Sequence, residues 1–189
     1  GEVMTEEKIR CWEKGSANPI PDSKYERYKE KLVELSKEYP ERNLMLFLLA
    51  RATGYRMQDI ITLTVGEIKD ALDKGYFEIQ EQKQYKQWQS EVAKNPNRRK
   101  PKKRIAEIGP ALEKHLKQYL KGKKRSEFAF PSRKGKGNEA LTQKSYSDKL
   151  KEVGKAIGLE HITGHSPRKT YATKIYTETN GNLEAVRIA

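Results

Sequence analysis

The sequence predicts a mainly helical α+β domain with a small antiparallel sheet near its middle. Most of the chain consists of segments of helical length with apolar residues on one face or all round. Two short segments with alternating apolar residues, 75–80 and 104–108, are predicted to pair as a hairpin between these helices. An order of helices, a small sheet and further helices favours the α+β class, and 189 residues suffice for a sizeable core.

Helices are predicted on both sides of that hairpin. Their expected ranges are 23–37, 40–53, 57–63, 110–120, 142–157, 165–177 and 183 onward. Asp22 or Ser23 can cap the first helix, and Gly54 follows the second, as glycine often follows a helix. The second helix is apolar nearly all round over 43–50, so we expect it in the core.

The chain is expected to divide at about residue 22. Residues 1–22 carry Pro19 and Pro21 and are interpreted as a short helix and a turn, which form a linker or the remnant of a preceding region. The remaining residues, 23–189, show no internal repeat and are interpreted as one functional domain.

A polar stretch, 82–103, separates the two predicted strands. It is long for a hairpin connection, and long loops are often either functional or disordered. We therefore expect either a flexible arm that contacts DNA phosphates or plain disorder. The basic residues expected to make such backbone contacts are Arg98, Arg99, Lys100, Lys102 and Lys103.

Composition favours a polyanionic partner in a reducing compartment. The chain has 39 lysines and arginines against 26 acidic residues, a formal net charge of +13, and basic side chains gain affinity for nucleic acid by releasing counterions. Cys11 is the only cysteine, so no intramolecular disulfide can form. The three histidines lack metal-ligand spacing, and no apolar run is long enough to cross a bilayer. We expect a soluble cytoplasmic protein with no bound metal and no membrane partner.

Two segments carry the pattern that points to chemistry. They are residues 53–63 (TGYRMQDIITL) and 163–173 (TGHSPRKTYAT), each with an arginine just after a turn. The common nucleotide-binding and metallopeptidase motifs are absent from the sequence. Two guanidiniums can clamp the non-bridging oxygens of a reacting phosphodiester and remain protonated throughout.

These segments resemble the two arginine boxes of the tyrosine recombinase (phage integrase) family. The first box has an acidic residue three positions after its arginine, as Asp59 follows Arg56. The second reads His-x-x-Arg-His and then Thr-aromatic-Ala-Thr, which is matched by His165, Arg168, Thr170, Tyr171, Ala172 and Thr173. Between the boxes, 130–132 (FPS) and 153–159 (VGKAIGL) are similar to further family segments, so the resemblance spans about residue 40 to the end.

The resemblance implies a role for each matched residue. Arg56 and Arg168 would clamp the phosphate, and His165 would handle a proton or orient the phosphate. A hairpin lysine would be the general acid; we choose Lys83 because it follows the first strand directly. Lys86 and Lys103 remain alternatives.

Two further residues have supporting roles. Asp59 would brace Arg56 or the helix after it. Lys169 stands where the family has its second histidine and keeps a positive donor there.

The resemblance also implies what is missing. The family's final motif, with its nucleophilic tyrosine, is not present in this chain, so we expect a domain truncated at its C-terminus. The full-length protein is expected to transfer DNA strands through a 3′-phosphotyrosine, without a cofactor, as a tetramer on double-stranded DNA at recombination sites of a mobile element.

The chain alone is expected to be monomeric, to bind DNA near the prokaryotic nucleoid and to fail to cut. The alternative is a non-catalytic basic DNA-binding domain derived from the same family.

Overall fold

The structure, a computed structural model, describes residues 17–134 and 137–178 and confirms the mainly helical α+β class. Its helices are α2 (Asp22–Leu35), α3 (Pro40–Thr53), α4 (Met57–Ile60), α5 (Val65–Lys74), α6 (Gln82–Val92), α7 (Pro110–Leu120), α8 (Gln143–Ala156) and α9 (Ser166–Glu178). The strands β1 (Tyr76–Ile79) and β2 (Arg104–Glu107) pair antiparallel, with Tyr76 opposite Glu107 and Ile79 opposite Arg104. The predicted helix from 183 onward lies outside the described residues.

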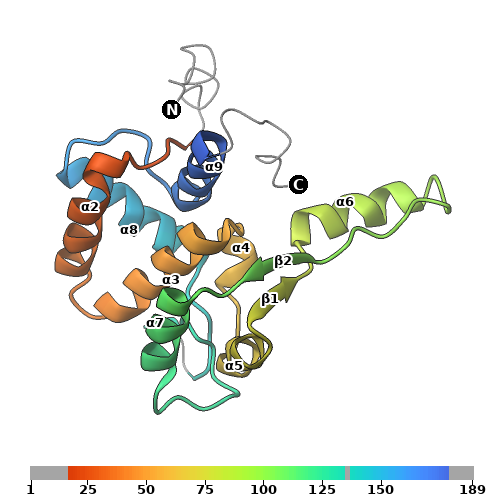
Figure 1. The fold of residues 1–189 in the computed structure, drawn as a ribbon, viewed down its shortest axis with the longest axis horizontal. Coiled ribbons are helices and arrows are strands. Elements are labelled where there is room, and N and C mark those ends of the chain that lie inside the picture. The colour runs from red at the N-terminus through yellow and green to blue at the C-terminus, as the bar shows by residue number, and fades with distance from the viewer. Residues whose placement is uncertain (1–16, 135–136, 179–189) are drawn as a thin grey trace.

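Helix α3 forms the centre of the helical body, as its apolar sequence predicts. It packs against α2, α7 and α9 (Figure 1). Leu46, Phe47 and Leu49 are completely buried, and the Phe47 ring lies against Tyr25 and Tyr28 with centroids 5.7 and 5.2 Å away. Burial of aliphatic and aromatic side chains on several faces of one helix is what stabilises this body.

Helix α5 was missed by the sequence analysis. Its N-cap Thr64 accepts a hydrogen bond from the Glu67 N–H at 3.1 Å, and the Glu67 carboxylate accepts one from the Thr64 N–H at 3.0 Å. Val65, Ile68 and Ala71 bury one face of the helix. This capping box with apolar residues at helical spacing was readable in the sequence.

Three predicted helix boundaries differ from the structure. Pro21 occupies the N-cap position of α2 and no side chain caps that helix, so neither Asp22 nor Ser23 has the expected role. The helix ends at Leu35 because Ser36 leaves the helical conformation and its buried hydroxyl accepts a hydrogen bond from Asn43 Nδ2 at 2.9 Å. Helix α4 ends at Ile60. Three residues later the Leu63 carbonyl accepts a hydrogen bond from the Ala129 N–H at 2.8 Å, so the chain there pairs with another segment and does not continue the helix.

Residues 17–21 lie against the domain that follows them. Ile20 is buried, and its N–H donates to Thr170 Oγ1 at 2.9 Å. The Asn18 N–H donates to the His161 carbonyl at 2.8 Å. The division of the chain near residue 22 remains a prediction, but this short stretch contacts both α9 and the loop that precedes it.

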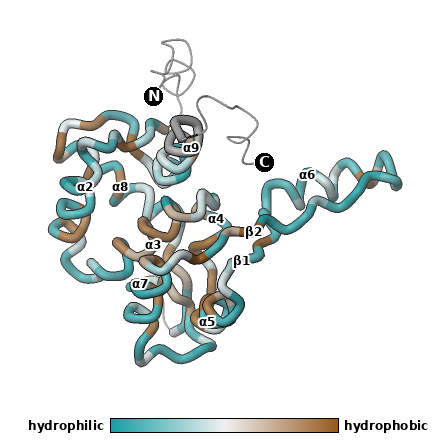
Figure 2. The backbone as a smooth tube through the Cα atoms, in the orientation of Figure 1, coloured by the Kyte–Doolittle hydropathy of each residue, from teal (hydrophilic) through white to brown (hydrophobic). Residues whose placement is uncertain are grey.

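The segment between the strands is more ordered than predicted. Residues 82–92 form helix α6, and 93–103 return along it to β2; we call residues 82–103 the arm. The arm extends away from the body (Figure 1) and is mostly hydrophilic, whereas hydrophobic residues gather in the body (Figure 2). No helix among the described residues combines the length and apolar character needed to cross a membrane.

Candidate functional site

The two arginine segments lie directly against each other at the junction of α3, α4 and α9. Gly54 ends α3 with a left-handed φ of 69°, and a Cβ added there would clash with the Tyr171 ring. A Cβ added to Gly164 would likewise clash with Met57 Sδ. Each segment therefore needs a glycine where the other inserts a large side chain.

This packing brings Arg56 and Arg168 together. Arg168 Nη1 donates to the Gly54 carbonyl at 3.1 Å, across 114 positions of sequence. Both arginines also bond one carboxylate oxygen, Glu81 Oε2, at 3.1 Å from Arg56 Nη1 and 3.4 Å from Arg168 Nη1. The sequence analysis paired these arginines but did not single out Glu81.

Asp59 contacts Gln82, where α6 begins; we call this start of α6 the root of the arm. It is buried, and its Oδ1 accepts a hydrogen bond from the Gln82 N–H at 2.9 Å. Burial raises the pKa of its carboxyl, with a contribution from the Glu81 charge, while the bond to Gln82 and the two arginines oppose the rise. The sequence analysis expected Asp59 to brace Arg56 or the helix after it. The hydrogen bond that the structure shows instead stabilises the start of α6.

Lys83 lies in the first turn of α6, exposed and two residues after Glu81. Its charge is among those that lower the pKa of His165. Lys86 lies further along α6, and Lys103 directly precedes β2; both are exposed.

His165 and Lys169 lie at the start of α9, on either side of Arg168 in the sequence. The His165 N–H donates to Thr163 Oγ1 at 3.1 Å, and Ser166 Oγ accepts from the Thr163 N–H at 2.9 Å, which shapes the turn before the helix. Partial desolvation and then the Arg56, Lys169 and Arg168 charges lower the pKa of His165. Burial and the charge of Arg168 lower the pKa of Lys169.

A third arginine, Arg104 at the start of β2, was not predicted. Its guanidinium lies over the Tyr55 ring, 4.5 Å from the centroid, and near the Tyr171 ring at 5.8 Å. Its Nη1 also donates to the Thr53 carbonyl at 3.0 Å. These contacts join β2 to both arginine segments; the sequence shows only another basic residue in a basic stretch.

The arm is held by contacts within itself. Tyr85 and Trp88 lie 5.6 Å apart between ring centroids, and Trp88 Nε1 donates to the Arg98 carbonyl at 2.9 Å. Arg98 pairs with Glu91, and Lys100 lies over the Tyr85 ring at 5.4 Å. These contacts account for an ordered arm where disorder was one expectation.

The arm is also the most basic part of the chain. Its 22 residues hold eight lysines and arginines and one glutamate. Arg99, Lys102 and Lys103 are exposed. The arm therefore carries much of the net charge of +13.

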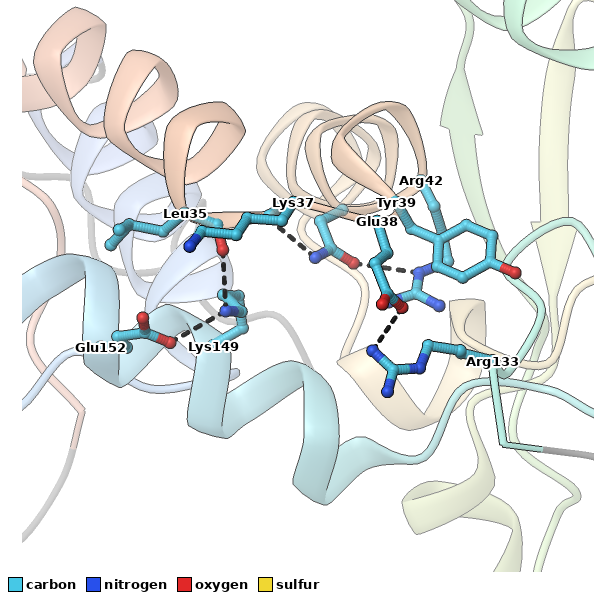
Figure 3. A pocket seen from close by; sticks show the side chains of 10 residues that line it. Leu35, Lys37, Glu38, Tyr39, Arg42, Arg133, Lys149 and Glu152 are labelled. Atoms are coloured by element: carbon cyan, nitrogen blue, oxygen red, sulfur yellow. Dashed lines mark hydrogen bonds and ion pairs between the residues drawn. The ribbon is translucent and has the colours of Figure 1, made fainter.

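A cavity of about 380 Å³ lies away from the arginine segments, between the end of α2, the start of α3 and α8 (Figure 3). Several of the charged side chains around it are paired: Lys149 Nζ bonds Glu152 at 2.9 Å and the Leu35 carbonyl at 3.0 Å, and Arg133 pairs with Glu38. We interpret it as a structural polar network. Among the side chains that the structure describes, no three histidine, cysteine or acidic residues are grouped to hold a metal ion.

Comparison with known proteins identifies the family. The sequence model of the phage integrase family matches residues 25–186 of this chain. The chain therefore belongs to this family, as its two arginine segments predict. The probable integrase/recombinase YoeC of Bacillus subtilis is 26% identical over 148 residues, which cover 78% of this chain and 70% of that protein. Tyrosine recombinase XerA of Pyrococcus furiosus is 25% identical over 173 residues, covering 91% of this chain and 54% of XerA.

Solved structures agree on the fold. The XerH site-specific recombinase bound to its difH substrate in a pre-cleavage complex aligns with a TM-score of 0.62 at 20% identity. The alignment covers 90% of this chain and 45% of the XerH chain. The chain thus spans about half the length of XerA and somewhat less than half of the XerH chain.

Proposed function

We propose that this chain is the phosphate-activating part of a site-specific DNA recombinase. The observation that carries the proposal is the convergence of Arg56 and Arg168 on one carboxylate. The charges of both arginines and of Lys83 also act on His165. Two adjacent guanidiniums fit a phosphodiester, because each can donate to non-bridging oxygens that gain negative charge during displacement. Membership in the phage integrase family supports the same class of reaction.

The proposed reaction is strand transfer in the full-length protein. A tyrosine hydroxyl attacks the scissile phosphorus, the bond to the 5′-oxygen breaks, and a 3′-phosphotyrosine forms that keeps the bond energy. Arg56 and Arg168 stabilise the charge on the phosphate, and Lys83 donates the proton that the leaving 5′-oxygen needs. His165, which its surroundings favour as a neutral ring, accepts the proton that the tyrosine hydroxyl loses or orients the phosphate. No cofactor takes part in these steps.

The proposed partner is double-stranded DNA at a recombination site, bound along the exposed cations of the arm. Arg99, Lys102 and Lys103 present their charge to solvent, and backbone contacts of this kind position a protein on DNA without reading its sequence. Lys100 and Arg98 combine such contacts with their roles inside the arm. We further propose that the full-length protein acts as a tetramer on the DNA of a mobile element in the cytoplasm.

The test is formation of a covalent protein–DNA adduct. Full-length protein is incubated with a nicked suicide duplex whose target sequence the protein itself has selected from random DNA. Arg168→Ala and Arg56→Ala should each lower the rate of adduct formation by about 10²- to 10³-fold, the effect of removing one preorganised charge donor. Arg125→Ala is the matched control, since Arg125 pairs with Asp70 at the exposed surface. Sequence-selective binding without any adduct would favour the non-catalytic DNA-binding domain instead.

A further inference from the structure

Glu81 is a buried carboxylate at the contact between the body, the arm and the two arginines. Its side chain is 5% exposed, and its Oε2 is shared by Arg56 Nη1 and Arg168 Nη1. Arg56 comes from the turn before α4, Glu81 from the turn between β1 and α6, and Arg168 from α9; Glu81 is 25 positions from Arg56 and 87 from Arg168 in sequence. One oxygen therefore bonds two guanidiniums that the chain brings from distant segments.

The backbone around Glu81 explains why its side chain faces the arginines. Glu81 is the N-cap residue of α6, yet its side chain caps no helical N–H. The next residue is fixed instead: Gln82 N–H donates to Asp59 Oδ1 at 2.9 Å, and Gln82 Nε2 donates to the Gln58 carbonyl at 3.0 Å. The start of α6 is thus attached to α4, and Glu81 is held inward.

Burial distinguishes Glu81 from the two arginines. The Arg56 and Arg168 side chains are 17% and 16% exposed, about three times the exposure of Glu81. Solvent, and an anion in it, therefore reaches the two arginine side chains more readily than it reaches the carboxylate.

The positive charges of Arg56 and Arg168 favour a carboxylate next to them. Two guanidiniums placed side by side repel each other, and partly buried charges are costly unless they are paired. Burial and then the charge of Arg56 lower the pKa of Arg168 to about 10, and the charge and hydrogen bond of Glu81 oppose that fall. The carboxylate thus helps to keep both arginines charged at one place.

We infer that Glu81 is a positioning residue whose buried carboxylate holds Arg56 and Arg168 side by side for the substrate phosphate and couples them to the root of the arm. This inference rests on the proposed role of the two arginines. Glu81 itself takes no part in the displacement and does not contact the reacting atoms. It contributes by fixing the positions of the two guanidiniums before the DNA binds. Such preorganisation lowers the activation barrier of the reaction.

The test compares Glu81→Gln with Glu78→Gln. Glu78 is an exposed residue of β1, so its substitution removes the same charge three positions away. In full-length protein, Glu81→Gln should lower the rate of adduct formation at saturating DNA by roughly 10- to 100-fold, the cost of small misplacements at a reacting centre. The Kd for the duplex should stay within about threefold, since other phosphate contacts dominate affinity. Glu81→Asp, which keeps the charge on a shorter side chain, should recover part of the rate.

The split between rate and affinity is the readout that a purely structural role would not give. A loss of folded protein would lower both, whereas displaced arginines should lower the rate at saturating DNA and leave the Kd nearly unchanged. A rate equal to that of the control, or faster cleavage, would overturn the inference; the latter would show that Glu81 competes with the phosphate.

A measurement on the unaltered 189-residue chain covers the case in which Glu81→Gln does not fold. Nitrogen-15 spectra of arginine side chains should show slow rotation of two guanidiniums, assigned to Arg56 and Arg168 by substitution. Fast averaged rotation of both would contradict a shared brace. This result is independent of strand transfer, so absence of an adduct in wild type would refute the proposed function and leave the brace to be judged by the spectra.

Discussion

In the body, Leu46, Phe47 and Leu49 have no exposed surface, whereas none of the residues of α6, all of which the structure describes, is buried. The arm is held by one ring pair, one indole hydrogen bond and contacts of Arg98 and Lys100. Body and arm are both ordered, but apolar burial stabilises the first and local polar and aromatic contacts the second. The two regions join at Glu81, the residue before the arm, which bonds Arg56 and Arg168 of the body.

The largest expected difference is in stability. Phe47→Ala should cost about 3–5 kcal/mol, because it opens a cavity against Tyr25 and Tyr28. Trp88→Ala should cost less than about 1 kcal/mol of global stability, because the arm can open without exposing the body core. Urea unfolding followed by circular dichroism measures both. Similar losses for the two substitutions would show that arm and body unfold as one unit.

A second prediction concerns the packing of the arginine segments. Gly54→Ala and Gly122→Ala both force alanine into a left-handed φ, +69° and +80°, but only Gly54 is close to a ring. Gly122→Ala should cost about 1 kcal/mol from backbone strain alone. Gly54→Ala should cost about 1–3 kcal/mol more, because Tyr171 must move. Denaturant midpoints of the two variants test this, and equal midpoints would argue against tight packing at Gly54.

The third prediction separates cations of the arm from cations of the body. If the arm follows the DNA backbone, Lys102→Ala should weaken duplex binding and reduce the slope of log affinity against log salt by about 1. Lys114→Ala, an exposed lysine on α7, should leave the slope unchanged. Fluorescence anisotropy over a range of salt concentrations gives both slopes. A slope that falls equally in both variants would remove the arm from the DNA interface.

The smallest expected effect is on proton uptake at His165. Burial and neighbouring cations hold its pKa below the ordinary 6.5, so the ring is neutral near pH 7. A bound phosphate adds negative charge and raises that pKa, so binding takes up a proton and affinity increases as pH falls below about 6.5. NMR titration of His165, assigned with His165→Gln, should show the low pKa in free protein. A pKa at or above 6.5, or equal pH dependence of binding in the variant, would contradict the assignment.

Local patterns in the sequence predicted most of the fold. The apolar run of α3, the alternation of the two strands and the spacing of α7 and α8 each depend on neighbours in sequence. Helix α5 was equally predictable from Thr64 and Glu67 and was missed only because its capping box was not considered. Helix α6 was harder, because its polar residues show no buried face and its order depends on residues 93–103 folding back on it.

The sequence by itself determined the residue types of the site: Arg56 and Arg168 stand in segments whose pattern indicates the family. Only the tertiary structure decided that Glu81, the N-cap residue of α6, bonds both of them, because ion pairs across 25 and 87 positions leave no periodic signal. It also decided which glycine receives which side chain, since the approach of Gly54 to Tyr171 depends on how α3 and α9 cross. A carboxylate acquires this role from burial and from its neighbours, and both of these are properties of the folded chain.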